Sequence, residues 1–211
     1  MSDIPTELET LFNTWGTDKS KRHKYHIVYE PVFEKLRDQE INILEIGVWD
    51  GASTKALFEY FPKANIYTID IFTRNHPSHI GVLKEERVHW IKGDSTVASI
   101  VPQIRKQWED VKFDIIIDDG AHRPLANMLT LRNLMQFLKE DGVYFIEDVW
   151  PMERMSFEEL GFAWLKDNPQ WYNHLDNNAF LGELDKHWTT RHDLRKVTGH
   201  GDSYIIEVQH P

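Results

Sequence analysis

Two short clusters of acidic residues are the feature of this sequence best suited to chemistry. Asp118 and Asp119 precede the run Gly120-Ala121-His122, and Glu147 stands next to Asp148. Each cluster directly follows a run of apolar residues typical of a buried strand. If the two strands end at the same edge of a sheet, four carboxylates crowd together, and their repulsion disfavours ionising all of them without a cation. The sequence therefore predicts a cation site.

The composition restricts which cation this can be. The chain contains no cysteine, which excludes a thiolate-bound zinc, a cysteine nucleophile and a disulfide framework. Oxygen donors favour hard cations, and Mg²⁺ suits a site that uses a few carboxylates and leaves positions for water or substrate. Neighbouring residues on a regular strand point to opposite faces, so Glu147 and Asp148 can share an ion only if the strand ends there. We predict that break.

The elements that position these residues form an alternating pattern. Strand-like runs alternate with helical stretches; we expect strands at 41–47, 65–71, 88–93, 113–118 and 142–148, and helices at 53–60, 95–108 and 125–139. A final hairpin is expected from strands at 193–197 and 204–208 around the turn TGHGD. The pattern predicts an α/β fold: a Rossmann-like, seven-stranded sheet, mostly parallel with a C-terminal antiparallel hairpin and helices on both faces.

The length suits a single domain over residues 1–211. We expect four segments within it: a helical lid segment at 1–40, a ligand-binding core at 41–150, an aromatic-rich segment at 151–190 and the hairpin at 191–211.

A glycine turn follows the first strand and could bind a small molecule. The strand runs through Glu45 to Gly47, and Gly51 precedes a helix that contains Ser53. Gly47 lets the backbone approach a ligand closely, and Gly51 permits a positive φ before the helix. The turn lacks the G-x-G-x-x-G pattern of dinucleotide folds.

Two further acids follow the next two strands. Asp70 ends the second strand, where a carboxylate can accept both hydroxyls of a ribose. Asp94, followed by Ser95, is placed after the third strand to accept from an adenine amino group. Together they predict a site for an adenosine-containing ligand. Each element also has a simpler interpretation, because any strand-turn-helix needs a glycine and Asp94 could cap a helix.

These motifs resemble those of class I S-adenosylmethionine-dependent methyltransferases, in which E-x-G-x-x-x-G is followed by an acid closing the second strand. More narrowly, the runs GTDK, HKYHIVY, LEIGVWDGAS, IDDGAH and IEDVW are similar, in that order, to the metal-dependent sugar O-methyltransferases of the mycinamicin and tylosin pathways. The similarity covers roughly residues 16–150. It implies S-adenosylmethionine and Mg²⁺ as cofactors, and methylation of a hydroxyl on a sugar or sugar-like molecule.

Carried over by position, the resemblance implies Asp119, Glu147 and Asp148 as ligands of the cation. A sugar hydroxyl has a pKa near that of water, about 15.7, so an imidazole with a pKa near 6.5 cannot deprotonate it alone. We therefore expect the metal to lower the pKa of the hydroxyl and His122 to accept its proton as general base. Asp119 is the alternative base, and His122 could instead be an exposed loop histidine. Asp118 is expected to orient the loop or contact the cofactor, unless it caps a helix.

The segment at 17–29 precedes the sheet, and in the resembled enzymes this part folds over the cofactor. We expect a lid, with cofactor contacts from Thr17 and Tyr29. The alternative is a basic surface turn followed by a packing helix, with Tyr29 and Phe33 in the core. The aromatic residues at 150–188 suit either sugar rings or a subunit interface. We expect them to support a homo-oligomer.

The charge balance and hydropathy narrow the class of partner. A net charge of −10 disfavours a nucleic-acid backbone, and no apolar run approaches the ~20 residues of a membrane span. These features predict a cytoplasmic enzyme acting on a small molecule, such as a glycoside or a nucleotide-linked sugar. Two competing functions are a catechol-type O-methyltransferase, whose usual Asp-Asn pair differs from Glu147-Asp148, and a non-catalytic cofactor-binding module.

Overall fold

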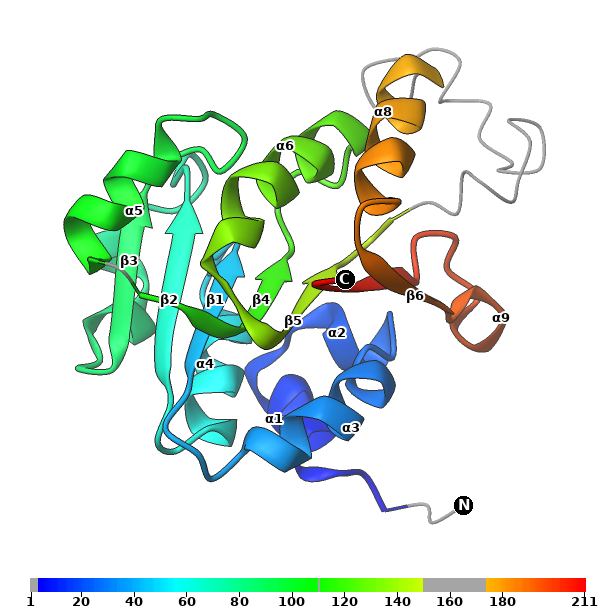
Figure 1. Cartoon of the computed structure of the whole chain (residues 1–211). Coiled ribbons are helices and arrows are strands. Elements are labelled where there is room, and N and C mark those ends of the chain that lie inside the picture. The colour runs from blue at the N-terminus through cyan, green and yellow to red at the C-terminus, as the bar shows by residue number, and fades with distance from the viewer. Residues whose placement is uncertain (1–3, 110, 150–173) are drawn as a thin grey trace.

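The chain folds around a seven-stranded sheet with helices on both faces (Figure 1), in a computed structural model that describes residues 4–109, 111–149 and 174–211. The strand order is β3-β2-β1-β4-β5-β7-β6. β1 to β5 are parallel, whereas β7 runs antiparallel between β5 and β6. The strands are β1 (Asn42–Ile46), β2 (Asn65–Asp70), β3 (Val88–Lys92), β4 (Phe113–Asp118), β5 (Leu138–Ile146), β6 (Trp188–Asp193) and β7 (Tyr204–Gln209). This confirms the expected fold class.

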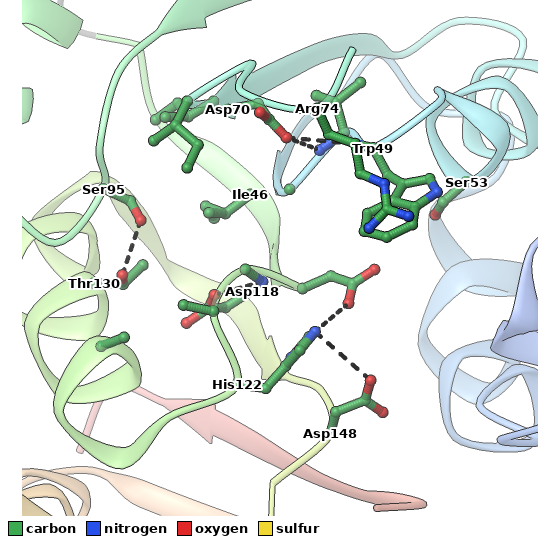
Figure 2. A pocket seen from close by; sticks show the side chains of 18 of the residues that line it. Ile46, Trp49, Ser53, Asp70, Arg74, Ser95, Asp118, His122, Thr130 and Asp148 are labelled. Carbon is green, nitrogen blue, oxygen red and sulfur yellow. Dashed lines mark hydrogen bonds and ion pairs between the residues drawn. The ribbon is translucent and has the colours of Figure 1, made fainter. Parts of the chain in front are cut away.

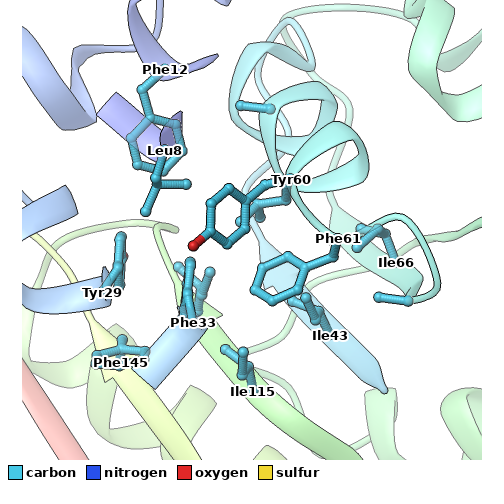
Figure 3. Close-up of a cluster of buried hydrophobic side chains, with 14 of the residues drawn as sticks. Leu8, Phe12, Tyr29, Phe33, Ile43, Tyr60, Phe61, Ile66, Ile115 and Phe145 are labelled. Carbon is cyan, nitrogen blue, oxygen red and sulfur yellow. The ribbon is translucent and has the colours of Figure 1, made fainter. Parts of the chain in front are cut away.

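The central strands are apolar along their whole length because each face of the sheet packs against a separate core. Ile43 and Ile115 point into one hydrophobic cluster, and their neighbours Leu44 and Ile116 point into the other. The first cluster, which includes Phe33 (Figure 3), lies beneath the N-terminal helices. The two-residue period of the strands thus fixes which side chains reach which helices.

The helices divide between the two faces (Figure 1). One face carries α1 (Glu7–Trp15), α3 (His26–Leu36) and α4 (Ala52–Tyr60), with α2 (Asp18–Lys21) near the sheet edge. The other face carries α5 (Ile100–Trp108), α6 (Pro124–Leu134) and α8 (His174–Leu184). Short elements complete the described chain: the 3₁₀ helices η1 (Pro77–His79), η2 (Gly81–Lys84) and η3 (Met135–Phe137), and the short helix α9 (Arg195–Thr198).

Three expected boundaries were wrong, because a turn hydrogen bond or strand pairing overrides the apolar pattern. Residues 95–99 form a turn before α5, since Asp94 accepts a hydrogen bond from the backbone of Thr96. The helix expected to reach residue 139 ends at 134, because Leu138 pairs with Phe113 in the sheet. Residues 195–198 form α9 instead of a strand, and the first strand of the hairpin lies at 188–193.

Within the part of the chain that is described, no helix has both the length and the apolar character needed to cross a bilayer. Most of the aromatic-rich segment, residues 150–173, lies outside the described residues. Phe180 of that segment lies on α8 and is buried, and Trp188 is exposed on β6.

Candidate active site at the carboxyl edge of the sheet

The carboxyl ends of four strands are followed by residues in unusual backbone conformations. Trp49, Phe72, His122 and Asp148 follow β1, β2, β4 and β5, and each has a positive φ between 48° and 54°. Such conformations cost on the order of 1–3 kcal/mol in residues other than glycine and cluster at functional sites. The strand break predicted at the Glu147-Asp148 pair is present, because β5 ends at Ile146 and Asp148 has a positive φ of 54°.

A cavity of about 1000 Å³ opens at this edge (Figure 2). Its walls come from the loops after β1 to β5 and from the start of α2. Ten of the residues predicted for the site line it: Thr17, Gly47, Ser53, Asp70, Asp94, Ser95, Asp118, Asp119, His122 and Asp148. The other four, Tyr29, Glu45, Gly51 and Glu147, do not line it.

The half of the cavity after β1 and β2 is shaped by Gly47 and Asp70. A side chain at position 47 would place its Cβ 2.1 Å from the carbonyl oxygen of Asp119, and φ of Gly47 is +90°. Only glycine fits there. The Asp70 carboxylate accepts from the backbone N–H of Val48 at 2.7 Å and of Phe72 at 2.5 Å. It therefore holds the glycine turn in place while one edge of its side chain faces the cavity.

The loop after β3 forms the next part of the wall. The exposed Asp94 accepts from the backbone N–H and the hydroxyl of Thr96 and so holds the turn that precedes α5. It does not cap that helix, because the N-cap of α5 is Ser99. Ser95 is buried, and its hydroxyl lies 2.9 Å from that of Thr130 on α6 (Figure 2). These residues fix the floor of the cavity where an adenine was expected.

Asp118 is buried and orients the loop that follows β4. One of its oxygens accepts from the backbone N–H of Gly120, and the other accepts from the amide of Asn127, each at 3.3 Å. Burial raises the pKa of Asp118 to about 6, against the lowering effect of the Asn127 hydrogen bond. This contact pattern supports the loop-orienting role.

Three of the predicted cofactor residues have structural roles behind the cavity. Glu45 is fully buried and accepts a 2.5 Å hydrogen bond from Thr54 of α4. Gly51 has the expected positive φ of +88° and packs so tightly that a Cβ would lie 2.6 Å from Ile80. Tyr29 stacks on Phe33 with ring centroids 4.8 Å apart, as in the packing alternative for this helix.

The half of the cavity after β4 and β5 contains the acidic cluster. Nε2 of His122 lies 3.6 Å from Oδ1 of Asp119 and 3.8 Å from Oδ2 of Asp148 (Figure 2). One donor atom from each of these residues lies within 4.8 Å of the others, close enough to hold one metal ion. The cluster thus unites the predicted base with two of the three predicted cation ligands.

Glu147, the third predicted ligand, is engaged by a residue that the sequence analysis left without a chemical role. Nζ of Lys19 lies 2.5 Å from Oδ2 of Asp119 and 2.5 Å from Oε2 of Glu147, and the Lys19 side chain is only 1% exposed. Burial lowers the pKa of Lys19, but the charges of Asp119 and Glu147 outweigh that effect and raise it well above its ordinary value. The ammonium group therefore stays charged.

Two tyrosines from the N-terminal segment complete the acidic half. The hydroxyl of Tyr29 donates to Glu147, and the hydroxyl of Tyr25 donates to Oδ1 of Asp148 at 2.5 Å. Burial raises the pKa of both tyrosines, so both stay protonated as donors. Lys19, Tyr25 and Tyr29 lie in the GTDK and HKYHIVY runs that carry the family resemblance, but the sequence did not indicate that they contact the acids.

An aromatic residue and a cation face the acidic cluster across the cavity (Figure 2). The guanidinium carbon of Arg74 lies 3.7 Å from the centroid of the Trp49 ring, and both residues line the cavity. The Trp49 side chain is exposed, and its carbonyl accepts from the amide of Asn75 at 2.7 Å. This stacked pair offers a flat surface to a bound molecule.

Comparisons with known proteins agree on the kind of domain. A family described as a methyltransferase domain matches residues 44–149. The 8-demethyl-8-(2-methoxy-alpha-L-rhamnosyl)-tetracenomycin-C 3'-O-methyltransferase of Streptomyces olivaceus is 33% identical over 154 residues, which are 69% of this chain and 37% of that protein. The mycinamicin VI 2''-O-methyltransferase of Micromonospora griseorubida is 32% identical over 129 residues, 58% of this chain and 30% of that protein.

Solved structures share the fold over nearly the whole chain. The mycinamycin-pathway methyltransferase MycE, in complex with Mg, SAH and mycinamycin VI, has a TM-score of 0.68 at 25% identity, covering 99% of this chain and 55% of that one. The methyltransferase PaMTH1 of Podospora anserina has a TM-score of 0.64 at 17% identity, covering 99% and 89%. The chain thus spans about a third of the two curated relatives and about half of the MycE chain.

Proposed function

The chain belongs to the methyltransferase domain family, and from this premise we propose that it transfers a methyl group from S-adenosylmethionine to a hydroxyl of a sugar or sugar-like small molecule. The observation that carries the proposal is the placement of His122 against Asp119 and Asp148 in the cavity that Gly47 and Asp70 also line. A methyl donor in one half of the cavity would face an acid–base group in the other.

The cofactor half fits an adenosine-containing molecule. The cavity volume of about 1000 Å³ is at the upper end of the range for small-molecule sites, so it has room for a cofactor and an acceptor. Gly47 keeps the wall free of side-chain atoms, and Asp70 presents a carboxylate beside it. The cofactor, when bound, supplies a methyl group on a positively charged sulfur. The chain's own residues would hold that methyl group in line with the acceptor oxygen. This positioning should supply much of the rate enhancement.

The acidic half fits a divalent cation. Oδ1 of Asp119 and Oδ2 of Asp148 are carboxylate oxygens on facing loops, and such hard donors suit Mg²⁺. Glu147, implied as a ligand by the family resemblance, lies next to them and contacts Lys19. A bound cation would lower the pKa of a coordinated hydroxyl.

His122 is then the proton acceptor. Its Nε2 faces the point between Asp119 and Asp148, where a hydroxyl would lie. An imidazole nitrogen that binds a metal cannot also accept a proton, so we assign the cation to the carboxylates and keep Nε2 for the hydroxyl. Asp119 remains the alternative base.

Three of the similar curated proteins support an acceptor that carries a sugar, since their names describe O-methylation of rhamnosyl or olivosyl compounds. This chain matches only 30% to 42% of the length of these relatives. From the sugars that the relatives' names contain, we propose a glycoside or a nucleotide-linked sugar as the acceptor. The aromatic pair of Trp49 with Arg74 is a suitable surface for the apolar side of a sugar ring.

The test is an acceptor screen with labelled S-adenosylmethionine. Sugars, glycosides and nucleotide-linked sugars are assayed in Mg²⁺, in a chelator, and after Mg²⁺ is restored. We expect methylation of at least one acceptor, loss of activity in chelator and recovery with Mg²⁺. Tight cofactor binding without methyl transfer to any acceptor would instead indicate a binding module. Full activity in chelator would remove the cation from the mechanism.

Light scattering on the same preparation tests the proposed homo-oligomer. A monomer at micromolar concentration would contradict it.

A further inference from the structure

Arg74 differs from most of the described arginines, because no acceptor of the chain engages its N–H groups. Among the others, ion pairs with carboxylates are formed by Arg22, Arg37, Arg132 and Arg195, and Arg87 donates to backbone carbonyls. Within residues 4–109, 111–149 and 174–211, Arg74 makes no hydrogen bond or ion pair, and its guanidinium lies over the Trp49 ring. Its N–H donors are therefore available at the wall of the cavity.

The stack on Trp49 fixes how Arg74 presents those donors. The guanidinium carbon lies 3.7 Å from the centroid of the ring, so the flat face of the cation covers the ring. The N–H groups lie in the plane of the guanidinium, so stacking leaves them directed sideways, away from the ring. Asn75 holds the other member of the pair, because its amide donates to the carbonyl of Trp49 at 2.7 Å. The pair thus presents a preorganised fork of donors.

This fork lies at the mouth of the cavity, across from His122 (Figure 2). Arg74 and Trp49 both line the cavity and are both exposed, so a molecule bound there can extend into solvent. The wall is otherwise acidic: among the described residues, seven aspartates line it, against the two arginines Arg74 and Arg123. Such a wall repels an anion except beside a cation. An anionic group of a bound molecule is therefore favoured at Arg74.

We infer that Arg74 binds a phosphate group of the acceptor, so that the sugar methylated by this chain is linked to phosphate, as in a nucleotide-linked sugar. This inference rests on the proposed function and chooses between its two classes of acceptor. A guanidinium binds phosphate through two parallel N–H···O hydrogen bonds, which its planar fork favours. With the phosphate on Arg74 at the mouth, the sugar ring spans the cavity and one of its hydroxyls reaches His122. The nucleotide then extends outwards past Trp49.

Nucleotide binding without a divalent cation tests this role separately from catalysis. UDP, dTDP and GDP are titrated by calorimetry into protein saturated with S-adenosylhomocysteine, in a chelator, so that no metal ion can bridge the diphosphate to the acids. We expect Arg74→Gln to weaken binding at least about tenfold, since charge-assisted hydrogen bonds are lost. Arg74→Lys keeps the charge without the fork and should lie between. Arg105→Gln is the matched control, at an exposed arginine of α5 outside the cavity, and should bind as the wild type does.

Turnover compares the two classes of acceptor directly. Labelled S-adenosylmethionine and Mg²⁺ are supplied with a nucleotide-linked sugar, the 1-phosphate of that sugar and its methyl glycoside. We expect kcat/KM to be at least about tenfold higher for the two acceptors that carry phosphate. Arg74→Gln should raise KM for these two far more than for the methyl glycoside. The same variant should keep its affinity for S-adenosylhomocysteine and for Mn²⁺, which replaces Mg²⁺ and is followed by electron paramagnetic resonance of the free ion.

The outcomes separate this inference from the function beneath it. Wild-type affinity for the nucleotides in Arg74→Gln or Arg74→Lys, no nucleotide binding by the wild type, or a preference for the methyl glycoside would overturn the phosphate role and leave methyl transfer intact. Loss of S-adenosylhomocysteine binding in Arg74→Gln would assign Arg74 to the cofactor and also overturn it. Absence of methyl transfer to every acceptor would contradict the proposed function, and the nucleotide titration would then decide by itself whether Arg74 binds phosphate.

Discussion

In the half of the cavity after β2 and β3, the acids accept hydrogen bonds from residues near them in sequence, whereas the acids after β4 and β5 contact residues a hundred or more positions away. Asp70 accepts from Val48 and Phe72, at most 22 positions distant. Asp119, Glu147 and Asp148 are contacted by Lys19, Tyr25 and Tyr29, at separations of 100 to 128. The first half is built locally and the second by tertiary contact.

The difference also concerns how charge is balanced. Asp70 and Asp94 lie at the cavity wall, where backbone N–H groups and solvent stabilise their carboxylates. Glu147 is almost fully buried, and an ion in such surroundings is stable only when it is paired and hydrogen-bonded. Lys19 supplies that pairing. The half after β2 and β3 can therefore bind a ligand through the shape of its backbone. The charged half after β4 and β5 keeps its acids stable only when the N-terminal segment packs against it.

The largest effect is expected where the two halves touch, at Gly47. Gly47→Ala should place a Cβ against the carbonyl of Asp119 in a strained backbone region. We expect it to lower the free energy of unfolding by at least about 3 kcal/mol, the sum of left-handed strain and overpacking, and to abolish cofactor binding. Chemical denaturation and calorimetric titration with S-adenosylhomocysteine measure both effects.

Gly199→Ala is the matched control, since Gly199 has a φ of +74° but nothing within 4 Å of a new Cβ. Gly199→Ala should lower the free energy of unfolding only by the cost of the left-handed backbone conformation, about 1–2 kcal/mol. Equal losses in the two variants would show that the halves are not in tight contact at Gly47.

The next largest effect is expected on catalysis, from His122 in the charged half. His122→Ala should lower turnover by about 10²-fold, the usual contribution of a general base, and leave cofactor affinity unchanged. His79→Ala, at an exposed histidine outside the cavity, should leave both quantities unchanged. Turnover is measured with saturating labelled cofactor. An unchanged rate in His122→Ala would transfer the base role to Asp119.

The comparison explains which parts were predictable from the sequence. The five parallel strands, the positive φ of Gly51 and the break after Ile146 follow from local patterns, and the structure confirms them. The site acids were found because parallel strands end at a common edge. Their excess of negative charge predicted only a metal ion, since nothing local in the sequence places Lys19 beside Glu147.

Local patterns also misled where tertiary contacts compete with them. Leu138 fits the helical spacing of α6, yet it pairs with Phe113 at the start of β5. Tyr29 lies in the motif that resembles a cofactor lid, yet its ring stacks on Phe33 and its hydroxyl reaches Glu147. In each case the deciding partner is distant in sequence, so no window along the chain could reveal it.

The smallest effects are expected from a pair of matched substitutions, Asp70→Asn and Asp148→Asn. They test most directly whether the two halves of the cavity bind their ligands separately. In Asp70→Asn, one acceptor oxygen becomes an amide that faces a backbone N–H, so the glycine turn loosens. We expect the dissociation constant of S-adenosylhomocysteine to rise about tenfold, since a buried donor loses its partner, and Mn²⁺ affinity to stay unchanged.

Asp148→Asn should do the reverse, weakening Mn²⁺ binding about tenfold or more and leaving cofactor affinity alone, because its free oxygen faces only the acidic cluster. Asp141→Asn, at an exposed position on β5, controls for the loss of one negative charge. If each substitution weakened both ligands equally, the two halves would form one coupled site, and the separation between local and tertiary construction would have no functional consequence. Opposite responses require that each half recognise its ligand through its own contacts, since the two variants differ only in which half loses a carboxylate.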